Sequence, residues 1–210
     1  ALPIFSSGLS ESVELLRLVN YAKIHLAPFK DETVPFLEEQ VTLLKGLSEA
    51  LAELKAGKLT SFAYWDKATS LREALRLTDK DHASGIYQNI AIKDVLPLLD
   101  EFQEVLTSGL KKAREIGGGI IPSYLIYDVA SYEMSDHVNF LGYPTVKATS
   151  FKLRTIPPFL EASARAMKLG QSVMSLQDYE AIKASDLYDH KLHFYKTCAS
   201  LDDAPFEIGR

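Results

Sequence analysis

Apolar residues recur every three or four positions through most of the first 116 residues. This spacing places them on one face of a helix. The pattern predicts a first helix over residues 9–26 and a second over 35–55. A third helix is expected from residue 61 to the polar stretch 78–82, and a long fourth helix over about 87–116. The first half of the chain is therefore predicted to be helical.

Proline and glycine residues mark where these helices begin, bend and end. Pro35 is expected in the first turn of the second helix, where its missing N–H group leaves no hydrogen bond unmade. Pro97 predicts a kink or a break near Asp94 in the fourth helix. The run 117–119 of three glycines should end that helix. No Lys-Ser or Lys-Thr pair follows the glycines, so they lack the signature of a phosphate-binding loop.

The spacing of apolar residues changes after the three glycines. A run of β-branched and aromatic residues over 121–129 predicts one strand, and the run 146–156 predicts a second. The stretch 132–144 is expected to be the loop between them. These features predict one β-hairpin around 121–156.

Helical patterns resume after the hairpin and complete the predicted fold. Ser175 and Asp178 have the spacing of a capping box, in which each side chain binds the backbone N–H of the other residue. We therefore expect a mainly α protein with six or seven helices, forming a single mostly helical unit over residues 1–210. The last three helices are predicted over 159–169, 175–184 and 185–195.

Composition places the chain among ordinary globular proteins. Apolar residues make up 47% of its 210 residues and charged residues 24%, which excludes a collagen-like or disordered chain. The single cysteine, Cys198, excludes an intramolecular disulfide. The net charge is −5 without any basic block, and no segment offers the roughly 18 apolar residues of a membrane span. We expect a cytoplasmic protein that binds neither nucleic acid nor a membrane.

The two ends of the sequence lack the polar character that is usual for the ends of domains. The chain begins at Ala1 and stops at Arg210, directly after an apolar-containing segment. These features predict that the chain is a fragment of a longer protein.

The predicted loop 132–144 contains the strongest catalytic candidates, namely Glu133, Asp136 and His137. Two carboxylates that face one pocket can act as general acid and base on a glycosidic bond. The alternative is a solvated turn, because most polar loops have no catalytic role. Tyr127, Tyr132 and Tyr143 lie in or beside this loop, where an aromatic face can bind a sugar. The alternative for these rings is packing in the core.

Asp189, His190 and His193 are the candidates for a metal site. On a helix over 185–195, residues three or four positions apart share one face and can converge on an ion. No known metal-binding motif accompanies them, and Lys191 adds a positive charge beside the site. A solvated helix face is the alternative. No cofactor is expected.

Four stretches of the sequence together resemble an internal region of large bacterial proteins of the cellobiose phosphorylase type. They are residues 84–95, 157–166, 185–189 and 206–210. The resemblance implies an (α/α) toroid, usually in a dimer, that cleaves a glycosidic bond with inorganic phosphate as co-substrate. No position here matches the motif that carries the catalytic Asp of this family, so the resemblance assigns no catalytic residue.

The leading hypothesis is therefore a segment of a carbohydrate-active protein that is inactive by itself. Its expected partners are the rest of the parent chain, an oligosaccharide and a second copy. The rival hypothesis is a non-enzymatic helical interaction or dimerisation domain, in which the leucine stripe over 37–54 faces a partner. A metal hydrolase that uses Asp189, His190 and His193 is a third.

Overall fold

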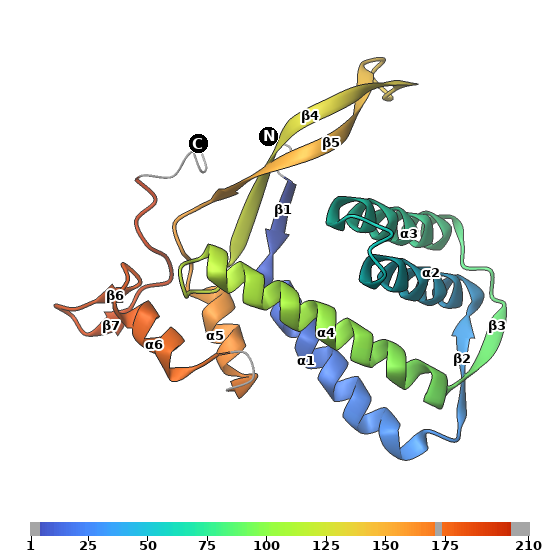
Figure 1. Cartoon of the computed structure of the whole chain (residues 1–210), viewed down its shortest axis with the longest axis horizontal. Helices are drawn as coiled ribbons and strands as arrows, with labels where there is room; N and C mark the ends of the chain where they lie inside the picture. The colour runs from blue at the N-terminus through green and yellow to red at the C-terminus, as the bar shows by residue number, and fades with distance from the viewer. Residues whose placement is uncertain (1–4, 171–173, 203–210) are drawn as a thin grey trace. The chain divides into compact units, whose positions relative to one another are not determined.

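Helices and short strands alternate along residues 5–170 and 174–202, the part of the chain that this computed structural model describes (Figure 1). The described residues form six α-helices and seven strands. In chain order they are β1 (Phe5–Gly8), α1 (Leu9–Leu26), a 3-10 turn (Ala27–Phe29), β2 (Thr33–Leu37), α2 (Glu38–Lys55), α3 (Ser61–Asp81), β3 (Tyr87–Ala91), α4 (Ile92–Ile116), β4 (Tyr124–Val138), β5 (Pro144–Thr155), α5 (Glu161–Met167), α6 (Leu176–Lys183), β6 (Tyr188–Asp189) and β7 (Phe194–Tyr195).

The described residues divide into two compact units. One is formed by the residues up to Arg17 together with those from Leu106 onward, and the other by Leu18–Val105. The strands pair in three small antiparallel sheets, in the orders β1-β4-β5, β2-β3 and β6-β7. The fold therefore mixes helices with antiparallel strands, which corrects the expectation of a mainly α protein. Six of the expected six or seven helices are present among the described residues, and β4 and β5 form the hairpin expected around 121–156.

In the Leu18–Val105 unit, α2 and α3 pack side by side (Figure 1). Thr60 begins α3, because its Oγ1 accepts a hydrogen bond from the N–H of Ala63 at 3.1 Å. Gly57 follows the end of α2 with a φ of 69°, a conformation that glycine adopts without strain. Leu51 is fully buried and Val41 nearly so. The leucine stripe over 37–54 thus contributes to the core of its own unit.

Strands β2 and β3 pair with each other in this unit. Residues 35–37 and 87–91 therefore lie in strands, where helix was expected. Pro35 lies opposite Asn89 in this ribbon and not in the first turn of a helix. Val34 precedes that proline, so the α conformation is disfavoured there, and its β-branched side chain suits a strand. Proline is tolerated because each strand of a two-stranded ribbon has a free edge.

The boundaries of two helices also differ from those expected. Helix α4 starts at Ile92 and continues to Ile116, so it is not broken near Asp94. Pro97 lies in its second turn, where the missing N–H removes one early hydrogen bond of the helix. Helix α3 continues through the polar stretch 78–81 and ends at Asp81.

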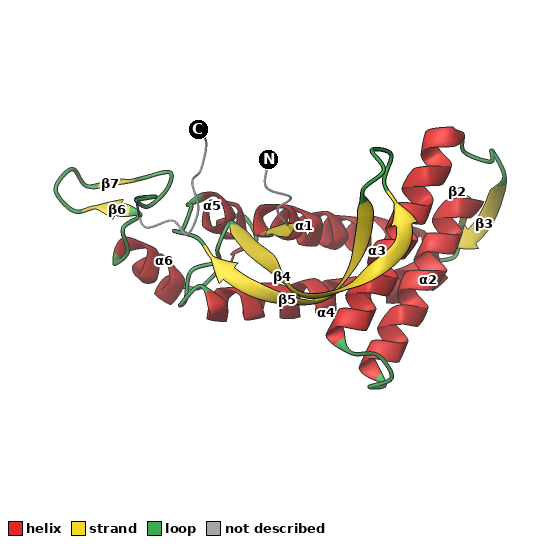
Figure 2. Ribbon diagram, turned by 90° about the horizontal axis from the view of Figure 1, so that it is seen from above, coloured by secondary structure: helices red, strands yellow, loops and turns green. Residues whose placement is uncertain are grey.

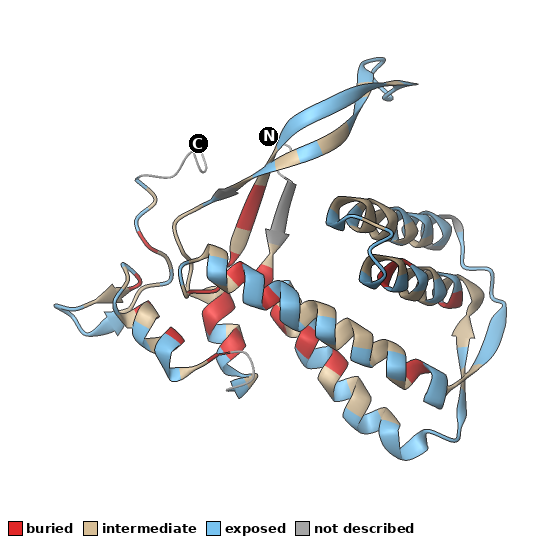
Figure 3. Ribbon diagram, in the orientation of Figure 1, coloured by how far each residue is buried: buried red, intermediate tan, exposed pale blue. Residues whose placement is uncertain are grey.

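The other unit has its core where the start of α1, the end of α4, the start of β4 and helices α5 and α6 meet (Figure 3). Ser123 joins three of these segments. Its Oγ donates to the carbonyl of Phe159 at 3.2 Å and accepts from the N–H of Ala162 at 3.1 Å. Its carbonyl accepts from the N–H of Leu9 at 2.9 Å. The most deeply buried apolar residues are Val13, Leu16, Ala162, Ala166, Ile182 and Leu187.

Strand β4 is much longer than expected. It continues to Val138, and β5 begins at Pro144, so most of the expected loop 132–144 is strand. The apolar side chains of Tyr132 and Met134 alternate with polar neighbours, which is the period of a half-exposed strand.

The expected last helix over 185–195 is absent from these described residues. Strands β6 and β7 form a short hairpin there, and His193 in its turn has a φ of 55°. The capping box is confirmed, because Ser175 and Asp178 each accept a hydrogen bond from the backbone N–H of the other. Helix α5 covers only Glu161–Met167 of the predicted range 159–169.

Candidate functional site

The β4–β5 hairpin carries most of the residues predicted to be functional. Among the described residues, strand β1 pairs with β4 from Tyr124 to Tyr127. Beyond that point the two strands continue without a third described strand, as a curved ribbon (Figures 1 and 2). We call this part, residues 128–152, the arm.

The turn at the tip of the arm is organised by Asn139. Its side-chain oxygen accepts hydrogen bonds from the backbone N–H groups of Leu141 at 2.9 Å and Tyr143 at 3.0 Å. Gly142 completes the turn with a φ of 81°, which few other residues adopt. The side chains of Phe140, Leu141 and Tyr143 at this turn are largely exposed to solvent.

The arm presents a set of exposed apolar side chains, which we call the arm surface. Phe140 at the tip is 95% exposed. On the regular part of the ribbon, Tyr132 and Met134 lie on one face, opposite Ala148 and Val146 of β5. Large apolar groups are seldom left together in water without a binding role. The arm surface consists of Tyr132, Met134, Val138, Phe140, Leu141, Tyr143 and Val146.

The catalytic candidates Glu133, Asp136 and His137 all lie on β4 and are exposed. Glu133 is paired across the ribbon with Lys147, and a register shift lies between Met134 and Val138. A carboxyl that acts as general acid is usually held in a pocket shielded from water. The structure places these carboxylates on an open ribbon, an arrangement suited to solvation.

The three candidate tyrosines have different surroundings. Tyr127 is half-buried against the core, and its ring meets Phe151 edge-on with the centroids 6.3 Å apart. It therefore matches the alternative of core packing. Tyr132 and Tyr143 are 60% and 65% exposed and belong to the arm surface.

The metal candidates Asp189, His190 and His193 lie in the β6–β7 hairpin. Asp189 Oδ1 accepts hydrogen bonds from the N–H groups of Leu192 and Lys191, both at 2.9 Å, and these bonds lower the pKa of Asp189. Among the described residues, no three His, Cys, Asp or Glu side chains are grouped so that they could hold an ion. The Asp189 carboxylate thus shapes the turn.

A charged cluster at the base of the hairpin was not foreseen from the sequence. Arg165 donates to Glu161 at 3.0 Å and to Glu14 at 3.1 Å, and these bonds raise the pKa of Arg165. Tyr124 donates to Glu161 at 3.3 Å, and this carboxylate raises the pKa of Tyr124. Arg17 also pairs with Glu14 at 2.8 Å, so two arginines balance the two carboxylates. The cluster joins α5 to α1 and β4, which suits a structural role.

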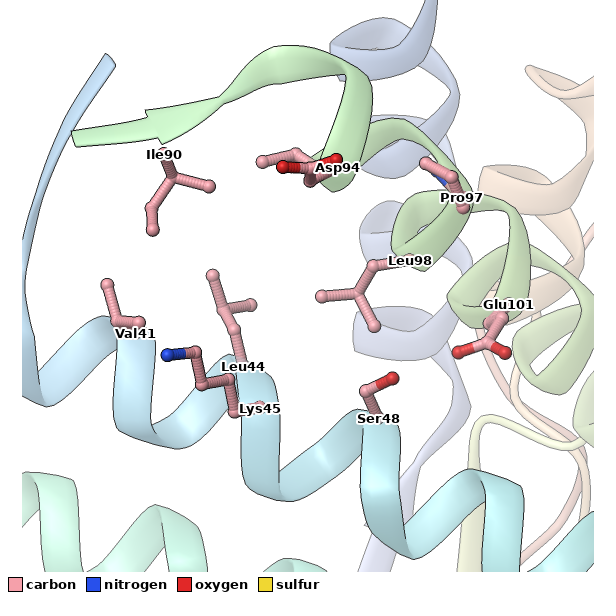
Figure 4. A pocket seen from close by; sticks show the side chains of 10 residues that line it. Val41, Leu44, Lys45, Ser48, Ile90, Asp94, Pro97, Leu98 and Glu101 are labelled. Atoms are coloured by element: carbon pink, nitrogen blue, oxygen red, sulfur yellow. The ribbon is translucent and has the colours of Figure 1, made fainter. Parts of the chain in front are cut away.

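A groove of about 340 Å³ lies between α2 and α4 in the Leu18–Val105 unit (Figure 4). Its walls are largely aliphatic, with Lys45 on α2 and Asp94 and Glu101 on α4. This size and lining suit a small apolar group. None of the described residues that line it is aromatic, so the groove lacks the stacking surface expected for a sugar.

Comparisons with models of known protein families and with curated proteins give no match. The similarity to the cellobiose phosphorylases therefore stays a prediction from the sequence. None of the described helices combines the length and apolar character that crossing a lipid bilayer requires.

Proposed function

We propose that this chain is a non-catalytic assembly segment of a carbohydrate-active protein similar to the cellobiose phosphorylases. In this proposal the arm makes the contact that holds the assembly together. The catalytic carboxylates, the phosphate site and the (α/α) toroid that encloses an oligosaccharide belong to the rest of that protein.

The exposed arm surface is the observation that carries the assembly role. Its apolar side chains are exposed on the part of the ribbon beyond β1, where no further described strand pairs with β4 or β5. A two-stranded ribbon is only marginally stable alone in water, and packing of its apolar face stabilises it. The exposure of Glu133 and Asp136 beside this surface argues for binding and against catalysis.

The resemblance of four sequence stretches supports the link to carbohydrate chemistry. Residues 84–95 include β3 and the start of α4. Residues 157–166 include the connection into α5 and most of that helix. Neither stretch contributes to the arm surface. The two parts of the proposal therefore rest on different residues. The resemblance supports the kind of parent protein, and the arm surface supports the role of this segment within it.

The test compares the 210-residue chain with the longer protein that contains it. Each is incubated with inorganic phosphate and a β-linked glucoside such as cellobiose, and the sugar phosphate released is measured. We expect release by the longer protein only. In the longer protein, Glu133→Gln with Asp136→Asn should leave the rate unchanged, because neither carboxylate takes part in the reaction.

Two results would contradict this function. If the longer protein releases no sugar phosphate, the carbohydrate assignment is wrong. If the two amide substitutions lower its rate by about 100-fold or more, as loss of a general acid does, the non-catalytic role is wrong.

A further inference from the structure

The groove between α2 and α4 combines an aliphatic interior with charged side chains on both of its walls (Figure 4). We infer that it binds a small zwitterion with a branched aliphatic side chain, that is, an aliphatic α-amino acid. In this inference Lys45 binds the carboxylate of the ligand and Asp94 binds its ammonium group. The site lies within the Leu18–Val105 unit, and it depends neither on the arm nor on the proposed function.

The interior of the groove is the first reason. Val41 and Val95 are almost fully buried, at 4% and 8% exposure. Leu44 and Leu98 are half-buried, and their side chains project from the two helices into the space between them (Figure 4). Covering a branched side chain of the ligand with these groups removes apolar surface from water, which is favourable. The volume of about 340 Å³ is near the lower end of the range for ligand sites, so the ligand should be small.

The charges that line the groove are the second reason. Lys45 on α2 and Asp94 on α4 are both exposed, so a ligand can reach them. Neither of them forms an ion pair with the other or with any further side chain that the structure describes. Glu101, on the same wall as Asp94, differs because its Oε1 lies 3.8 Å from Nζ of Lys55. The groove therefore offers one cation and one anion to a ligand.

The presence of both charges selects the class of ligand. An aliphatic acid could bind Lys45, but it would cover Asp94 without offering it a hydrogen-bond donor. An aliphatic amine would leave Lys45 without an acceptor in the same way. A charged group that loses water without gaining a partner is destabilised. An α-amino acid carries its ammonium and carboxylate groups on one carbon atom, so it can bind both walls while its side chain enters the groove.

The test follows the isotope-labelled 210-residue chain by two-dimensional NMR while L-leucine is added. Leucine reaches about 10 mM, at which a site with a dissociation constant of about 1 mM is nearly full. We expect the amide signals of Val41, Lys45 and Leu98 to shift until they saturate. Isocaproate, which lacks the amino group of leucine, and isoamylamine, which lacks its carboxylate, are the matched ligands. Each should bind about five-fold more weakly, because each loses one ion pair that is partly open to water.

Variants of the two charged residues identify the contacts. Lys45→Gln and Asp94→Asn should each raise the dissociation constant for leucine about five-fold. Lys58→Gln and Asp31→Asn remove the same charges at exposed residues outside the groove and should leave it unchanged. Lys45→Gln should also abolish the preference for leucine over isoamylamine, because the carboxylate then has no partner. All four substituted residues are exposed, and circular dichroism checks that the variants fold.

Three results would overturn the inference. The first is a wild type whose signals do not respond to leucine in a saturable way. The second is isocaproate binding as tightly as leucine, which would make the groove a site for aliphatic acids. The third is leucine binding that is unchanged in both Lys45→Gln and Asp94→Asn.

Discussion

Replacing Gly117 with alanine tests how the last turn of α4 leads into β4. A Cβ atom at this position would lie 2.0 Å from the carbonyl oxygen of Ile120 and 3.0 Å from Cδ of Pro122. Both separations are shorter than the roughly 3.5 Å at which non-bonded atoms attract each other. The closer contact is with the backbone, which cannot rotate away as a side chain can. The loop must therefore move to accept the methyl group.

The expected loss of stability depends on the core residues that lie in this loop. Ile120 and Ile121 come directly after the glycines and are 9% and 4% exposed, as members of the core of their unit. Forcing an extra carbon into a packed region typically costs about 1–3 kcal/mol. Because backbone that positions two core residues is displaced, we expect Gly117→Ala to lower the free energy of unfolding by about 2–3 kcal/mol.

Gly109 in the middle of α4 provides the matched control. A Cβ atom there meets no atom within 4 Å. Alanine is favoured over glycine in a helix interior by about 1 kcal/mol, so Gly109→Ala should stabilise the chain by that amount. Urea denaturation followed by circular dichroism measures both variants. The reasoning is refuted if Gly117→Ala is as stable as the wild type, or if the two substitutions shift stability in the same direction.

Two further predictions concern the core and the pH dependence of stability. Leu51→Ala, at a fully buried position of α2, should lower the free energy of unfolding by about 2–5 kcal/mol in urea denaturation, while Leu77→Ala at a 63% exposed site should change stability little. The neighbouring hydroxyl of Tyr179 and burial raise the pKa of Tyr195 to about 12. The folded chain then keeps a proton that the unfolded chain loses near pH 10, so stability should fall between about pH 10 and 12. Tyr195→Phe should reduce this fall, and an unchanged pH profile would contradict the assignment.

The helices were the most predictable part of the fold. Helix α1 was predicted over residues 9–26 and is found at Leu9–Leu26. Helix α3 begins after Thr60, and α6 begins with the capping box at Ser175. These features depend on apolar spacing and on caps within a few residues, so the local sequence contains the information.

The strands were less predictable because their partners lie far away in the chain. Val34 pairs with Ile90, and nothing near either residue indicates the other. The pattern over 87–116 reads as one helix because a five-residue strand is too short to interrupt the helical period clearly. The β6–β7 hairpin likewise depends on Asp189, which binds two N–H groups and closes a turn inside a segment predicted to be helical.

The candidate site was predicted in part. The sequence directed attention to residues 132–144, and the structure places Tyr132 and Tyr143 on the arm surface. The bridge from Arg165 to Glu14 joins residues 151 positions apart, so no local pattern could reveal it. Phe140 and Leu141 did leave a signal, since two apolar residues stand between the turn-forming Asn139 and Gly142.

The same alternation explains both why the arm is unsuited to catalysis and why it is suited to binding. In a strand, neighbouring side chains point to opposite faces, so Glu133 lies on the face opposite to Tyr132 and Met134. A loop can fold two carboxylates and a ring into one pocket, whereas a regular ribbon separates a polar residue from the apolar residues beside it. That separation gathers the apolar groups into one surface. Contact of this surface with water is unfavourable, and a second apolar face can cover it. The residues expected to form a catalytic loop lie largely in strand, and their exposed apolar face supports the proposed interface.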